Sequence, residues 1–89
     1  MGRGKPQRVE YRSEDGTICG AMTSPTRKGR DDIVRRSLFR MEHHRGVIRV
    51  QTVGARGWAY YVKHLPHRNE ADYCRESDLP AWATFDKES

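Results

Sequence analysis

Apolar and polar residues alternate in residues 9–14, and a second short strand-like segment follows in residues 17–22. The dipeptide Asp15-Gly16 lies between them, and Asp-Gly in this position is typical of a two-residue type I′ hairpin turn. Such a loop pairs Val9 with Met22. The larger apolar side chains of both strands then share one face: Val9, Tyr11, Ile18 and Met22.

A second strand pair is predicted from residues 47–53 and 58–65, which the glycine-rich segment 54–57 separates. A three-residue loop pairs Val50 with Tyr60 and keeps Trp58 out of water, so we prefer this register. Its apolar face holds Ile48, Val50, Trp58, Tyr60 and Val62. The opposite face is expected to be exposed and holds Arg49, Gln51, Tyr61 and Lys63.

One amphipathic helix is predicted at about residues 31–45, between the two hairpins. Asp31 is a good N-cap, and Gly46 is placed for the position just beyond the C-terminus. At about 100° per residue, one buried stripe forms: Ile33, Val34, Ser37, Leu38 and Met41. Arg36 and Arg40 lie on the opposite arc.

These elements predict an α+β fold of the order ββαββ, with the helix packed on an antiparallel sheet. Residues 1–7 are expected to form a flexible basic arm, residues 8–66 the folded domain, and residues 67–89 an acidic tail. A short helix is possible in residues 69–76, and the tail is expected on or near the core. The sequence leaves open whether the hairpins form one four-stranded sheet or two layers.

Length and charge narrow the functional classes. The chain has 89 residues and a net charge of +5. Residues 1–63 hold fourteen basic and six acidic residues, whereas residues 64–89 hold three basic and six acidic ones. A basic body with an acidic tail favours a polyanionic partner or a tail that folds back, although a solvated charged surface has the same composition.

Targeting signals and cysteines give little further information on the function. No apolar stretch approaches the ~20 residues of a membrane span, and the N-terminal residues lack the apolar core of a secretory signal, so we expect no membrane contact. Cys19 and Cys74 are too few for a disulfide scaffold, which favours a cytoplasmic protein. Whether the two cysteines pair is left open.

The leading functional hypothesis is a non-catalytic, basic accessory protein that binds DNA or RNA. Basic side chains on the helix and second hairpin would contact phosphates, and an exposed tyrosine would stack on a base. The candidate residues are Arg35, Arg36, Arg40, Arg49, Arg56, Tyr61 and Lys63. The alternative is a small regulator or inhibitor that binds an acidic surface of another protein, because charge alone does not separate the two partners.

Other chemistry is weakly indicated. His64, His67 and Cys74 lack the paired spacing of a zinc site, so we predict neither metal nor other cofactor. No nucleophile, base and orienting group can be assembled around His43 or His44, so we predict no enzyme and no small-molecule substrate. Leu79, Trp82 and Phe85 suit either a groove-binding motif or a tail that closes the protein's own core. Exchange of that tail would permit a homodimer.

Overall fold

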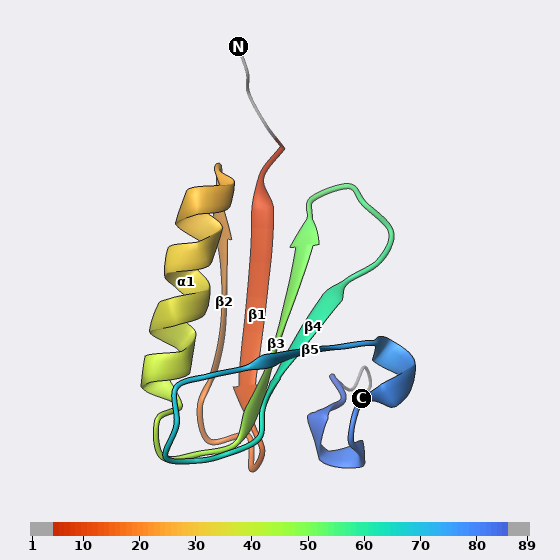
Figure 1. Ribbon diagram of the computed structural model, residues 1–89. Coiled ribbons are helices and arrows are strands. Elements are labelled where there is room, and N and C mark those ends of the chain that lie inside the picture. The colour runs from red at the N-terminus through yellow and green to blue at the C-terminus, as the bar shows by residue number, and fades with distance from the viewer. Residues whose placement is uncertain (1–4, 86–89) are drawn as a thin grey trace.

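Five strands form one antiparallel sheet in the computed structural model, which describes residues 5–85 (Figure 1). The strands lie in the order β2-β1-β3-β4-β5. The elements along the chain are β1 (Gln7–Ser13), β2 (Cys19–Ser24), α1 (Arg27–Arg40), β3 (Gly46–Thr52), β4 (Ala59–Lys63), β5 (Asp72–Cys74), and the single 3-10 turns η1 (Glu76–Asp78) and η2 (Ala81–Ala83). The α+β class is therefore confirmed. The ββαββ arrangement is incomplete, because β1 joins both hairpins into one sheet and β5 extends it.

The first hairpin has the predicted register but a different turn. Tyr11 pairs with Gly20 and Val9 with Met22, as the alternation indicates. A type I′ turn needs positive φ at both central residues, yet only Gly16 has one, at 77°. Ser13 closes the turn instead, since its carbonyl accepts from the Gly16 amide at 3.0 Å.

The second hairpin has a register that the sequence does not predict. Ile48 pairs with Tyr61 and Val50 with Ala59. This pairing places Trp58, Tyr60 and Val62 on the face opposite Ile48. The prediction placed all four residues on the same face. The prediction assumed that only one face is buried, whereas the C-terminal segment covers the second face and removes that constraint.

Helix α1 begins and ends four to five residues earlier than predicted, at Arg27 and Arg40. The cap is Thr26 and not Asp31, because the Thr26 hydroxyl accepts from the Gly29 amide at 3.0 Å. Gly46 belongs to β3, where a Cβ would collide with Met41. The predicted stripe is confirmed: Ile33, Ser37 and Met41 are buried, and Val34 and Leu38 pack beside them.

The two faces of the sheet are covered by different segments (Figure 1). Helix α1 packs on one face, over a cluster that includes Val9, Tyr11, Ile48 and Val50. The C-terminal segment packs on the other face, over Val47, Tyr60 and Val62. The short helix expected in residues 69–76 is absent there, because Tyr60, Tyr61 and Val62 pair with β5 instead.

Candidate nucleic-acid interface

The outer face of α1 carries the clearest group of basic side chains. Helix α1 holds six basic and two acidic residues, which gives it a net charge of +4. Arg35, Arg36 and Arg40 are exposed on it, and they surround Phe39, whose exposed fraction is 65%. These residues and Asp32 line one shallow hollow on the helix surface. Three of the seven residues predicted for nucleic-acid binding therefore lie together.

Two of these arginines are free to meet a ligand. Arg35 donates to Asp32 across one helical turn at 3.3 Å, a pair that is exposed on both sides. Arg36 and Arg40 form no hydrogen bond or ion pair to a side chain within residues 5–85. They are four residues apart, so their guanidinium groups lie on the same side of α1, one turn from each other.

The structure places Arg49 away from the helix and inside the opposite layer. Its guanidinium donates from Nε and Nη2 to Glu10, at 2.8 and 2.7 Å. The same group lies 4.0 Å from the centroid of the Trp58 ring and 4.3 Å from that of Phe85. The expectation of an exposed Arg49 is therefore wrong, because the C-terminal segment covers it.

Lys63 is also not on an exposed face, since its exposed fraction is zero. Its ammonium group donates to three backbone carbonyls, those of His44, Leu65 and Pro66, at 2.9, 2.8 and 3.0 Å. Burial lowers the pKa of Lys63, and the charge of Glu42 opposes this effect. The side chain ties the segment after α1 to the segment after β4.

The remaining two predicted residues are separated from α1. Tyr61 is partly buried beside the helix cluster and meets Tyr73 edge to face, with 5.9 Å between ring centroids. The open stacking platform that was expected around Tyr61 is therefore not formed. Arg56 is exposed, but it lies in the β3–β4 loop, which Figure 1 shows on the other side of β1 from α1.

The C-terminal segment closes the core of the second face and does not project from it. Leu79, Trp82 and Phe85 pack against the buried residues of that face, and Ala83 is fully buried. Arg45 lies 4.8 Å from the centroid of the Trp82 ring. Sequence reasoning missed this role of arginines as aromatic contacts, because the partners lie far apart in the chain.

Arg12 holds the same segment through its backbone. Its guanidinium donates to the carbonyls of Trp82, at 3.0 Å, and Thr84. It also lies 5.8 Å from the centroid of the Phe85 ring. Arg12 on β1 and Arg49 on β3 therefore both fix the segment on the sheet.

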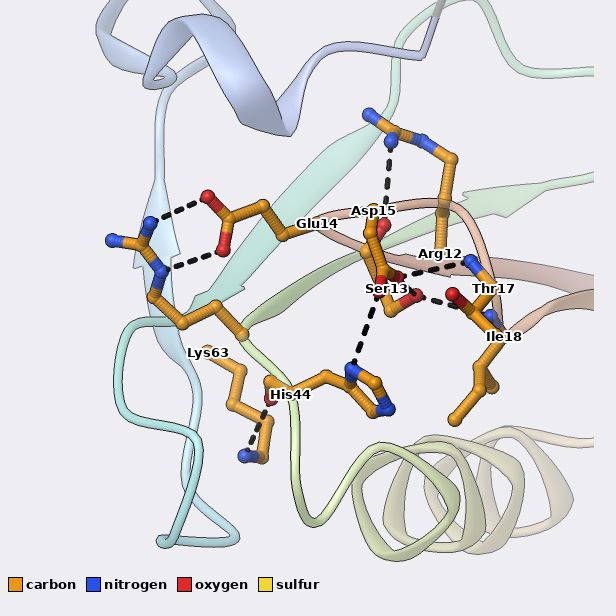
Figure 2. Close-up of polar contacts among 9 residues, drawn as sticks. Arg12, Ser13, Glu14, Asp15, Thr17, Ile18, His44 and Lys63 are labelled. Carbon is orange, nitrogen blue, oxygen red and sulfur yellow. Dashed lines mark hydrogen bonds and ion pairs between the residues drawn. The ribbon is translucent and has the colours of Figure 1, made fainter.

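A polar cluster joins the β1–β2 turn to the residues after α1 (Figure 2). Asp15 accepts from the Ser13 hydroxyl at 2.8 Å and from the Thr17 amide at 3.0 Å. Hydrogen bonds from Thr17 and Ser13, with a smaller contribution from His44, lower the pKa of Asp15 to about 2. His44 Nδ1 lies 3.9 Å from the other carboxylate oxygen.

The order of these groups favours a structural role for the cluster. A serine nucleophile needs its hydroxyl on the histidine, whereas the Ser13 hydroxyl donates to Asp15. Ser13 is also fully buried. Beside the cluster, Arg45 donates from Nε to Glu14 at 3.0 Å, so the turn is tied to the segment after α1.

Within residues 5–85, no group of three or more His, Cys, Asp or Glu side chains is arranged to hold a metal ion. Cys19 is exposed and Cys74 partly buried, and both thiols are free. In the described part of the chain, no helix has the length and apolar character to cross a bilayer.

Comparison with protein-family models, curated proteins and solved structures returned no match.

Proposed function

We propose that the protein binds nucleic acid through the outer face of α1, without catalysing a reaction. The observation that carries the proposal is the exposed pair Arg36 and Arg40, which has no acidic partner within residues 5–85. An unpaired guanidinium forms charge-assisted hydrogen bonds with phosphate oxygens, and its binding releases condensed counterions. Arg35 adds charge next to them, since its bond to Asp32 is long and exposed.

Phe39 extends the proposal from phosphates to bases. Phe39 is 65% exposed among arginines and belongs to neither hydrophobic cluster of residues 5–85. Aromatic side chains stack on unpaired bases, at about 1–3 kcal/mol per base. We therefore expect Phe39 to increase the affinity for single strands more than for duplexes.

The distribution of charge supports the same orientation. The basic helix covers one face of the sheet, and the C-terminal segment, which is uncharged in residues 79–85 and acidic before them, covers the other. Between residues 64 and 85 there are two basic and four acidic residues. A polyanion is therefore attracted to the helix side and repelled from the opposite side.

The test is fluorescence anisotropy with labelled single- and double-stranded DNA and RNA, across a series of salt concentrations. The double variant Arg36→Glu/Arg40→Glu should weaken binding and reduce the slope of log K against log salt by about two or more. The matched control is Arg68→Glu/Arg75→Glu, which changes the net charge equally but on the acidic segment.

The two double variants distinguish a binding site on α1 from an effect of the total net charge. If α1 is the site, the control keeps the slope and most of the affinity of the unaltered protein. Equal losses in both double variants would mean that only total charge matters, and the helix would lose its assignment. Absence of binding by the unaltered protein near physiological salt would contradict the proposed function as a whole.

A further inference from the structure

Strand β2 lies at the edge of the sheet and leaves one row of peptide groups open. The Ser13 amide donates to the Ile18 carbonyl at 2.8 Å, so the peptide groups of Ile18 point toward β1. Directions alternate along an antiparallel strand. Those of Gly20 and Met22 therefore also face β1, whereas the amides and carbonyls of three exposed residues point away from the sheet: Cys19, Ala21 and Thr23.

This edge lacks the features that commonly prevent pairing with another chain. Strand β2 has six residues, and none of them is charged or a proline. Monomeric proteins usually protect edges with charges, prolines or very short strands. The opposite edge has such protection, because β5 has only three residues and begins with Asp72. Of the two edges, β2 is the one suited to accept a further strand.

A groove lies directly beside this edge, between β2 and α1. Its lining residues are Tyr11, Met22, Ile33, Arg36, Ser37 and Arg40. Met22 is apolar and has an exposed fraction of 49%. Arg36 and Arg40 provide the positive charge. An open backbone edge, an apolar contact and two cations are thus combined along one line.

We propose that the α1–β2 groove binds an extended acidic segment of another protein, which pairs with β2 as an additional strand. Main-chain hydrogen bonds to Cys19, Ala21 and Thr23 would provide affinity, and side chains entering the groove would provide specificity. Carboxylates of the segment meet Arg36 and Arg40, and an apolar residue covers Met22.

Charge complementarity decides for this occupant over a second copy of the chain. Symmetric pairing of β2 with itself places two copies of α1 on the same face of a continuous sheet. Arg36 and Arg40 of both copies then line one seam, with no acidic side chain bonded to them within residues 5–85. An acidic strand satisfies the same backbone groups and neutralises the arginines.

The site uses arginines of the proposed nucleic-acid face, so an acidic segment and nucleic acid would compete for the protein. Peptide binding does not, however, depend on the nucleic-acid proposal. The probe is a short, end-capped, fluorescein-labelled peptide with the repeat glutamate–glutamate–valine–valine, so that the strand face toward the groove carries both carboxylates and apolar side chains. Its controls are a lysine–valine peptide with the same repeat and two glutamate–valine peptides that are N-methylated at alternate residues. The first of these lacks the N–H groups on one edge, and the second lacks those on the other edge.

Fluorescence anisotropy should detect binding of the glutamate–valine peptide. The affinity should fall roughly tenfold or more for the lysine–valine peptide and for at least one of the two N-methylated peptides. Arg36→Glu/Arg40→Glu should lose at least as much. Ala21→Pro removes an outward N–H but no hydrogen bond to β1. It should therefore lower the affinity for the peptide and leave nucleic-acid binding unchanged. Amide exchange should slow at Cys19, Ala21 and Thr23, whereas Gly20 and Met22, already paired with β1, should change little.

The failures are distinguishable. Peptide binding that tolerates N-methylation on either edge would reduce the site to an electrostatic contact and overturn strand addition. A dimer in analytical ultracentrifugation, together with no peptide binding, would mean that β2 pairs with a second copy of the chain and would overturn the proposal. Nucleic-acid binding without peptide binding would overturn it too, while the function proposed for α1 would stand.

Discussion

Replacing Arg49 by alanine tests whether this arginine fixes the C-terminal segment on the sheet. The side chain joins three parts of the second layer: Glu10 on β1, Trp58 before β4, and Phe85 in the segment. Glu10 keeps its second partner in the variant, because Arg8 donates to it at 2.8 Å. The expected effect is therefore the loss of the Arg49 contacts, without the cost of an unpaired carboxylate.

The magnitude follows from these contacts. Hydrogen bonds to a charged group contribute about 1.5–3 kcal/mol, and a partly shielded cation–π contact contributes about 1 kcal/mol. The exposed fractions of the Arg49 and Glu10 side chains, 22% and 18%, place the pair between surface and core. We expect Arg49→Ala to lower the free energy of unfolding by about 3 kcal/mol, and Tm by about 15 °C in a domain of this size.

Urea denaturation followed by circular dichroism measures the free energy of unfolding directly. The control is Arg8→Ala, which removes the other arginine on Glu10, with 42% of its side chain exposed. Exposed pairs contribute about 0–1 kcal/mol, so this control should lower stability by less than about 1 kcal/mol. Arg49→Lys should fall between them, because lysine keeps the charge but lacks the planar fork. Equal losses for Arg49→Ala and Arg8→Ala would refute the reasoning.

Two further predictions concern the core and its acid response. Truncation after Asp78 should abolish cooperative thermal unfolding, because it exposes Val47, Tyr60 and Val62 to water. Burial of each apolar side chain involved contributes about 1.5–3 kcal/mol. Truncation after Phe85 is the control, and a cooperative melt retained after truncation at Asp78 would contradict the assignment of the segment to the core. Burial raises the pKa of Glu10, but its bonds to Arg8 and Arg49 outweigh this and hold the pKa below 4.5, while that of Asp15 falls from 3.8 to about 2. Both groups contribute stability that is fully present above their unfolded pKa values and is lost as pH falls through the folded ones. Stability should therefore decline below about pH 4.5, and Glu10→Gln should flatten the upper part of that decline in a pH series of urea melts; an unchanged decline would contradict the contribution of Glu10.

Features that depend on near neighbours were predictable from the sequence. The pairing of Val9 with Met22 follows from the position of Asp15-Gly16 and from the alternation around it. The buried stripe of α1 follows from helical periodicity, even though the helix begins at another cap. Thr26 and Asp31 are both good N-cap residues, and the sequence contains no local signal that decides between them.

Features that depend on the second layer were not predictable. Trp58 was expected to share a face with Ile48 and Val50, since a sheet with one buried face allows only that register. The second face, which the C-terminal segment covers, shields Trp58 from water instead, and Arg49 lies over the Trp58 ring there. Strand β5 has no local signal either, because Asp72 disfavours a strand and the edge of β4 supplies the pairing.

The same cause explains why three of the seven predicted site residues, Arg49, Tyr61 and Lys63, are buried or partly buried instead of exposed. The sequence does not indicate whether a basic residue on a strand faces water or an aromatic ring that a distant segment supplies. The C-terminal segment, distant in sequence, covers Arg49, whereas Lys63 is buried among carbonyls after α1 and directly after its own strand. Arg36 and Arg40 stay exposed because nothing in residues 5–85 packs on the outer side of α1. Arg12 and Arg49 hold the uncharged residues 82–85 on one face of the sheet, and the basic side chains of α1 lie over the other face. Under the proposed function, the side from which a polyanion would approach is therefore set by the packing and not by the composition.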